Sequence, residues 1–284
     1  MEEAVERAVA AMRSRYDERL SVADLAAEAF FSPFHFSRIF RRELGVSPVQ
    51  YLTAVRLFEA KRLLQATSLN VADIACRVGY VGIGTFTTRF TTLVGVPPGH
   101  YRRLPASRML AIADGIRQLP TWNEAPAAAA HPPRTVRGGR IVGSTLPVAG
   151  SAVRRLFVGV FDDAIPQGPP VAWRLVTGDD IGRWRLDDIP AGRWVVIAVA
   201  DGGAATGESL GGNGVAAAAD RNRPFCWLAA QAPATFSVGI SGQLHVMSGT
   251  ITRVALRLRQ PQRTDPPILI PLCNRITHPT RLAA

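Results

Sequence analysis

The sequence contains 284 residues, of which 47% are hydrophobic, and is long enough for two domains with hydrophobic cores. Its net charge of +11 suits an anionic partner such as nucleic acid. The three cysteines lack Cys-x-x-Cys spacing and no run of about eighteen apolar residues occurs, which argues against a disulfide framework, a zinc module and a membrane segment, and for a reduced, cytoplasmic protein.

Residues 1–20 form the first predicted element, an amphipathic helix with a single apolar stripe. An internal repeat follows it. Ser-Val-Ala-Asp-Leu-Ala-Ala at 21–27 recurs as Asn-Val-Ala-Asp-Ile-Ala-Cys at 70–76, and Leu-Gly-Val-Ser-Pro at 44–48 recurs as Val-Gly-Val-Pro-Pro at 94–98. One residue is inserted between the matching halves. We therefore expect two copies of one supersecondary unit.

Each copy predicts two short helices joined by a tight turn. Ser21 and Asn70 are suitable N-caps for the first helix, and a glycine ends the second. The second helix is amphipathic, and its apolar positions recur every four residues: Phe36, Phe40 and Leu44, then Phe86, Phe90 and Val94. Cys76 takes an alanine position of the repeat and is expected in the core. This is the helix-turn-helix arrangement, in units of about 21–45 and 70–95.

A connecting helix is predicted between the two units, at residues 48–67. Ser47 is its expected N-cap, and Pro48 suits its first position. Twenty helical residues span about 30 Å, which is close to the roughly 34 Å between successive major-groove segments on one face of DNA. One chain can therefore present both second helices to adjacent turns of a duplex.

Three segments of this region carry a family resemblance. They are Ser-Pro-Phe-His-Phe-Ser-Arg-Ile-Phe-Arg-Arg-Glu-Leu-Gly-Val-Ser-Pro at 32–48, Ile-Ala-Cys-Arg-Val-Gly-Tyr at 74–80, and Gly-Val-Pro-Pro-Gly-His-Tyr-Arg-Arg at 95–103. In order and distance they resemble the tandem helix-turn-helix domain of AraC/XylS-type transcription regulators. The resemblance implies an all-α DNA-binding domain at 1–105 that binds double-stranded DNA, and a contact with RNA polymerase if the protein is an activator.

By position, the resemblance places base-reading side chains near the start of each second helix. In the first copy these are Phe34, Ser37 and Arg38, and in the second Ile83, Gly84, Thr85 and Thr88. Arg38 is the strongest candidate, because an arginine in the major groove can donate two hydrogen bonds to a guanine. A phosphate contact or a solvated helix face is the alternative for Arg38. Arg41 and Arg42 are expected on phosphates.

The second copy departs from the family pattern. Thr88 stands where many members carry an arginine, and the arginine has moved to Arg89. This half is expected either to contact thymine methyl groups, through Ile83 and the threonines, or to position the first half on the DNA backbone.

The second half of the chain predicts β structure after a linker at 106–135. Leu-Phe-Val-Gly-Val-Phe at 156–161 is typical of a buried strand. Trp184 and Leu186 start a strand-turn-strand pattern that reverses at Pro-Ala-Gly and returns from Trp194. The pattern is similar to prealbumin-like and carboxypeptidase-regulatory-like domains, with a generic all-β domain as the alternative. We expect a multidomain chain, α then β: the helical domain, then an antiparallel β-sandwich at 136–262 and a tail at 263–284.

One stretch of the β-rich half matches an enzyme motif. Gly-Glu-Ser-Leu-Gly at 207–211 fits the G-x-S-x-G nucleophile elbow, but glycines surround it where a strand and a helix are required. We therefore predict no catalytic residue, no metal site and no cofactor. The favoured function is a sequence-specific transcription regulator whose β domain serves effector sensing, dimerisation or protein contacts. The alternatives are a carbohydrate-binding or hydrolytic protein acting through the β domain, and a DNA-architectural protein. A small-molecule effector and a homodimer stay open.

Overall fold

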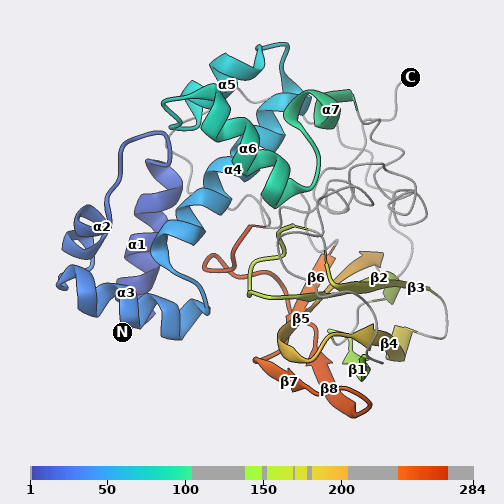
Figure 1. Cartoon of the computed structure of the whole chain (residues 1–284). Coiled ribbons are helices and arrows are strands. Elements are labelled where there is room, and N and C mark those ends of the chain that lie inside the picture. Colours follow the sequence, from blue (N-terminus) through green and yellow to red (C-terminus); the bar gives the residue numbers. More distant parts are fainter. Residues whose placement is uncertain are drawn as a thin grey trace.

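The computed structural model has a helical part followed by a part made of two β-sheets (Figure 1). The structure describes residues 2–103, 138–148, 152–168, 170–177, 181–203 and 236–267. Outside the described residues lie the expected linker at 106–135, the 207–211 motif, Cys226, Cys273 and the tail beyond residue 267.

The helical part follows the repeat. Its elements are α1 (Glu2–Ser14), α2 (Val22–Glu28), α3 (Pro33–Leu44), α4 (Pro48–Ala66), α5 (Val71–Arg77), α6 (Ile83–Val94) and α7 (Pro98–Arg103). Helices α2 and α3 form the first helix-turn-helix unit and α5 and α6 the second, and Figure 1 shows α4 crossing from one group to the other. The two predicted units and the connecting helix are confirmed.

The helix ends are fixed by the capping residues that the sequence indicates. The hydroxyl of Ser21 accepts from the backbone of Asp24, whose carboxylate accepts from the backbone of Ser21 in return, which is a capping box. Asn70 caps α5, while Gly45 and Gly95 end α3 and α6 in the left-handed conformation, at φ 75° and 95°. Each of these caps satisfies backbone groups that a helix end leaves without a partner.

The first helix is shorter than expected, because α1 ends at Ser14 and not at residue 20. The following segment is held in a turn by Arg56 of α4, whose guanidinium donates to the carbonyl oxygens of Tyr16 at 2.7 Å and Glu18 at 2.6 Å. These carbonyls face a side-chain donor, so they do not continue the helical ladder.

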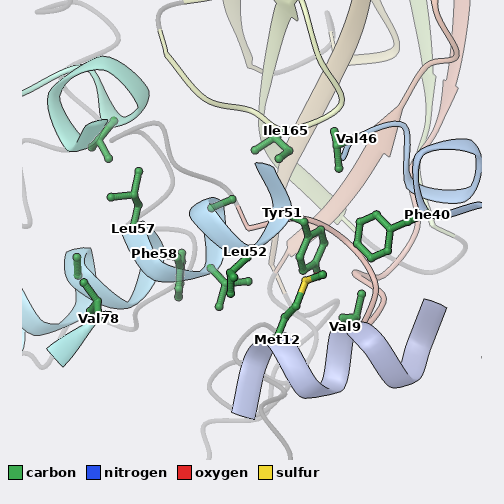
Figure 2. Close-up of a cluster of buried hydrophobic side chains, with 14 of the residues drawn as sticks. Val9, Met12, Phe40, Val46, Tyr51, Leu52, Leu57, Phe58, Val78 and Ile165 are labelled. Carbon is green, nitrogen blue, oxygen red and sulfur yellow. The ribbon is translucent and has the colours of Figure 1, made fainter. Parts of the chain in front are cut away.

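The helical core repeats an aromatic motif. Phe40 meets Tyr51 edge to face, with ring centroids 5.7 Å apart, and the second copy pairs Phe90 with Tyr101 at 5.6 Å. Figure 2 shows Phe40 and Tyr51 beside Met12 of α1. The expected core position of Cys76 is wrong: its side chain is exposed, because α5 buries Ile74 and Ala75 and the next residue lies about 100° further around the helix.

The β part contains two sheets. A three-stranded sheet has the order β4-β1-β8, formed by β1 (Gly139–Leu146), β4 (Arg183–Ile189) and β8 (Ile251–Arg257). A second sheet has the order β3-β2-β5-β6, with β7 paired to β5; its strands are β2 (Ala152–Phe161), β3 (Ala172–Thr177), β5 (Gly192–Gly203), β6 (Phe236–Ile240) and β7 (Leu244–Val246). One hydrophobic cluster contains residues from both sheets, including Ile141 and Trp184 of the first and Val158 and Val196 of the second.

Two features of the sheets differ from expectation. The sheets are antiparallel except for β1 and β8, which pair in parallel; these strands are far apart in sequence, so no hairpin turn dictates their direction. The turn at Pro190 does not form a paired hairpin, because it carries the chain from β4 in one sheet to β5 in the other.

Two segments of the β part form hydrogen bonds with the helical part. Asp163, in the loop after β2, accepts from the side-chain amide of Gln50 at 2.9 Å, and the backbone N–H of Gly168 donates to the carbonyl oxygen of Leu93 at 2.7 Å. The second segment is at Asp265, whose carbonyl oxygen accepts from Arg13 at 2.7 Å and from the hydroxyl of Tyr51 at 3.2 Å. Loop 162–168 therefore contacts the connecting helix α4 and the second helix-turn-helix unit.

Candidate nucleic-acid interface

The first candidate set lies on one exposed face of α3. Its residues follow each other at i, i+3, i+4 and i+7, and are Phe34, Ser37, Arg38 and Arg41. The helix buries its other face in the core, so this face is left to solvent. Phe34 is 80% exposed at the first turn, and Ser37 donates its hydroxyl proton to the carbonyl oxygen of Pro33 at 2.8 Å. Ser37 therefore offers mainly acceptor lone pairs to a partner.

The three arginines of α3 differ in their surroundings. Arg38 and Arg41 are exposed and make no hydrogen bond or ion pair with the residues that the structure describes, whereas Arg42 pairs with Glu43 at 2.8 Å. Asp163 of the β part lies within electrostatic range of Arg41, and burial raises the pKa of the Asp163 carboxyl. Arg38 and Arg41 can therefore meet DNA without breaking a side-chain contact, while Arg42 has a competing carboxylate.

The second candidate set lies at the start and along one side of α6. All of its members are exposed: Ile83, Gly84, Thr85, Thr88 and Arg89. The N-cap of α6 is Gly82, which has no side chain to cap the helix, whereas the hydroxyl of Ser32 caps α3. The two sets are not brought together into one patch. They lie on separate helices, in the two groups that α4 connects (Figure 1).

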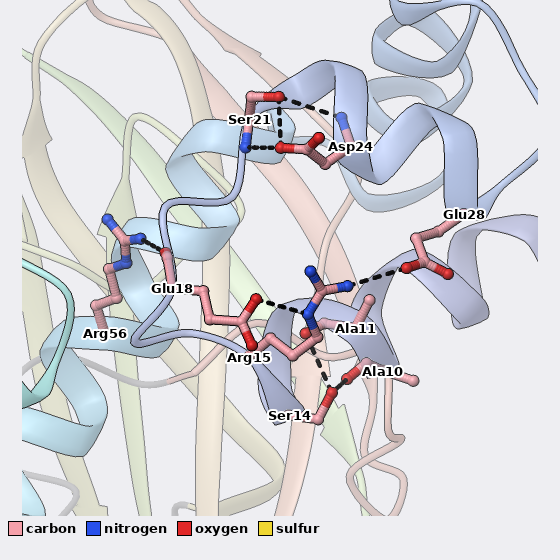
Figure 3. Close-up of polar contacts among 9 residues, drawn as sticks. All are labelled: Ala10, Ala11, Ser14, Arg15, Glu18, Ser21, Asp24, Glu28 and Arg56. Atoms are coloured by element: carbon pink, nitrogen blue, oxygen red, sulfur yellow. Dashed lines mark hydrogen bonds and ion pairs between the residues drawn. The ribbon is translucent and has the colours of Figure 1, made fainter.

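Polar contacts link the first unit to the segment that follows α1 (Figure 3). Arg15 pairs with Glu18 at 2.8 Å and with Glu28 of α2 at 3.0 Å. The side-chain hydrogen bond from Ser21 lowers the pKa of Asp24, so the capping carboxylate is ionised at neutral pH. These contacts hold α2, and α2 packs against the recognition helix α3.

Two exposed apolar residues were missed by the sequence analysis. Phe30 is 84% exposed in the turn before α3, and Val81 is 82% exposed in the turn before α6. A signal for Phe30 exists in the repeat: it aligns with Gly79, and both adopt positive φ, 60° and 81°. The guanidinium of Arg7 lies over the exposed ring of Phe30, 5.5 Å from its centroid. Both residues lie shortly before the first turn of the second helix of their unit, Phe30 before α3 and Val81 before α6.

The described residues hold neither a membrane-crossing helix nor a metal cluster. None of the helices in the described ranges is long and apolar enough to cross a bilayer. In the same ranges, no three His, Cys, Asp or Glu side chains gather as metal ligands would.

Comparisons with known proteins agree with this geometry. The sequence profile of a family described as "Helix-turn-helix domain" matches residues 25–104. A stretch of 100 residues is 32% identical to the lactose operon transcription activator of Staphylococcus xylosus, covering 35% of this chain and 36% of that protein. A stretch of 84 residues is 34% identical to the HTH-type transcriptional activator AarP of Providencia stuartii, covering 30% of this chain and 62% of that protein.

A solved structure also matches this part of the chain. It is the crystal structure of a transcriptional regulator from Chromobacterium violaceum, described as having an AraC-type DNA-binding domain. The sequence identity is 28% and the TM-score is 0.35, and the match covers 36% of this chain and 90% of that chain. The chain thus spans about a third of the length of the lactose operon activator and less than two thirds of AarP. Residues 25–104 belong to the AraC family of helix-turn-helix domains.

Proposed function

We propose that this chain is a sequence-specific DNA-binding transcription regulator whose helices α3 and α6 read adjacent segments of the major groove. The observation that carries the proposal is that the first turns of α3 and α6 are both exposed, in the two helix groups that α4 connects. That helix has 19 residues and is therefore about 28 Å long, close to the roughly 34 Å of one DNA turn. The names of the two relatives, both transcriptional activators, support a regulatory role.

Each candidate residue has a role in the proposal. Arg38 donates two hydrogen bonds to a guanine edge, and Arg41, one turn further along α3, binds a phosphate. Phe34 lies beside the groove at the first turn. In the second unit, Ile83 contacts thymine methyl groups and Arg89 binds the phosphate backbone of the DNA. The contrast between a charged α3 and a threonine-rich α6 supports unequal halves, with the first carrying most of the direct readout.

The β part has a separate role in the proposal. Two sheets that share one hydrophobic cluster support a β-sandwich domain at 136–262, following the helical domain at 1–105. This domain senses an effector or contacts a protein partner, such as RNA polymerase at an activated promoter or a second copy of the chain. The work of such a regulator on chromosomal DNA places it in the cytoplasm.

The test is selection of bound sequences from a random DNA pool by the full-length protein at a stated salt concentration. The wild type is expected to enrich two elements about one helical turn apart. Arg38→Ala should relax one position within one element and weaken binding by about 1–3 kcal/mol, or roughly 5- to 150-fold. Arg174→Ala is the matched control, because Arg174 is an exposed arginine on β3. Sequence-indifferent binding that is equally insensitive to both variants would refute the proposal.

A further inference from the structure

The outer face of the three-stranded sheet is rich in arginine. On β1 the buried residues alternate with solvent-facing ones, and the solvent-facing positions pair across the sheet with the outer residues of β4 and β8. Five arginines belong to this outer face: Arg140, Arg183, Arg185, Arg253 and Arg257. We call this set the arginine face.

The strand register gathers these side chains into one patch. Val142 of β1 has Arg185 as its partner on β4 and Arg253 as its partner on β8, so two arginines flank one central residue. In the next row, Ser144 has Arg183 on one side and Ala255 on the other. The neighbours are small, so they leave the guanidinium groups open to a ligand. Strand spacing places arginines about 7 Å apart along β4 and about 10 Å apart across the sheet.

Carboxylates neutralise the patch only in part. Asp187 on β4 pairs with both Arg140 and Arg185, and Asp188 is a second exposed carboxylate on the same strand. Arg183, Arg253 and Arg257 are exposed and make no hydrogen bond or ion pair with any described residue. The sheet therefore holds three arginines near one another, with guanidinium N–H donors that have no partner among the described residues. These positive charges repel one another, and an anionic ligand would reduce the repulsion.

We propose that the arginine face is a second DNA-contact surface, which binds phosphates of the duplex flanking the site read by α3 and α6. This inference rests on the proposed function. A flat guanidinium group matches phosphate oxygens with two parallel hydrogen bonds. Because the same chain holds the duplex through its helix-turn-helix domain, flanking phosphates within reach of this face are at a raised effective concentration.

Charge distribution favours DNA over an acidic protein as the partner. The centre of a protein interface is usually apolar, whereas the exposed apolar side chains of this face, Leu146 and Ile251, lie at opposite ends of their strands.

The experiment measures the affinity of the full-length protein for two duplexes across a salt series. The short duplex contains only the selected site, and the long duplex extends it by about three helical turns on each side. The test variant combines Arg183→Gln, Arg253→Gln and Arg257→Gln. The control variant removes the same charge from exposed positions outside the face: Arg174→Gln, Arg193→Gln and Arg263→Gln.

The wild type should bind the long duplex at least about tenfold more tightly than the short one. The test variant should lose that gain and lower the slope of log affinity against log salt by about 2–3 on long DNA, since each phosphate contact contributes about 0.9. Its affinity for the short duplex should stay within about twofold. The control variant should keep the gain.

Equal losses in the test and control variants, or a length gain that the test variant retains, would overturn the inference. Binding of the face to phosphatidylserine vesicles or to polyglutamate, without any length gain on DNA, would also overturn it. Failure of the proposed function looks different, because binding to the short duplex would then be insensitive to Arg38→Ala. Long random-sequence duplexes test the arginine face even in that case.

Discussion

Replacing Gly79 with alanine should destabilise the helical domain strongly, although it adds only one methyl group. Gly79 closes the turn between α5 and α6 at φ 81°, a conformation that costs an L-residue about 1–2 kcal/mol. An added Cβ would lie 2.9 Å from the carbonyl oxygen of Tyr16 and 3.0 Å from that of Asp17. Both neighbours are backbone atoms, which cannot rotate away as a side chain can.

The structure also shows why those carbonyls resist displacement. Arg56 donates to the carbonyl oxygens of Tyr16 and Glu18, so moving this segment would lengthen two hydrogen bonds from a charged donor. Overpacking of this kind costs about 1–3 kcal/mol. The reduced entropy of the unfolded chain returns about 0.4–1 kcal/mol. We therefore expect Gly79→Ala to lower the free energy of unfolding by about 2–3 kcal/mol.

The assay is urea unfolding followed by far-UV circular dichroism. Phe30→Ala is the matched control, because Phe30 holds the equivalent turn position at φ 60° and is exposed. That variant keeps a Cβ in the same conformation, so its unfolding free energy should change by less than about 1 kcal/mol. A Gly79→Ala variant within about 0.5 kcal/mol of the wild type would refute the reasoning, since both the dihedral cost and the contact would then be absent.

Three further predictions concern buried polar groups. Burial raises the pKa of Glu59. The contribution of Glu59 to stability is therefore fully present below its ordinary pKa of about 4.5 and is lost as pH rises through the pKa of the folded state. In urea titrations, the unfolding free energy of Glu59→Gln should increase relative to that of the wild type as pH rises across this window. Lys61, the lone lysine of the sequence, is 2% exposed beside Phe58, so an amine-reactive ester should modify it only after unfolding, as mass spectrometry of peptides would show. Tyr51→Phe removes a hydroxyl that accepts from Arg13 at 2.6 Å and should cost about 1.5–3 kcal/mol in urea unfolding.

Each of these expectations has a contrary outcome. A stability difference for Glu59→Gln that shrinks as pH rises would reverse the assigned direction of the pKa shift. Labelling of Lys61 at the rate of a free amine in the folded protein would contradict its burial. A Tyr51→Phe variant as stable as the wild type would show that the guanidinium of Arg13 does not depend on the hydroxyl.

Much of the helical part follows from local chemistry that the sequence displays. Ser21 and Asn70 are capping residues by their side chains alone, and Phe36 and Phe40 are spaced by one turn, so helix starts and buried faces were predictable. The start of the opening helix was also clear. Its end was not, because it depends on Arg56, which lies 40 residues away from Tyr16 in sequence.

The β part was predictable in its strands but not in their partners. The run at 156–161 is fully apolar apart from one glycine, and it forms part of the buried strand β2. Pairing depends on contacts that are distant in sequence, and no local signal distinguishes a parallel β1 and β8 from an antiparallel pair. The same reason hid the arginine face, whose members come from three strands spread over more than a hundred residues.

The candidate DNA-binding residues came from position within a motif, and their exposure is compatible with that assignment. Phe30 was overlooked because two phenylalanines in succession suggest core packing, whereas only Phe31 packs against the core. The positive φ of Phe30 is indicated in the sequence only by the glycine at the matching place of the second copy.

Loop 162–168 connects the β part to two separate places in the helical part. It contacts Gln50 at the start of α4 and Leu93 at the end of α6, so a change in this loop would alter the surroundings of both helices together. If a molecule bound to the β part changed this loop and thereby the free energy of DNA binding, DNA would by reciprocity change the affinity for that molecule by the same factor.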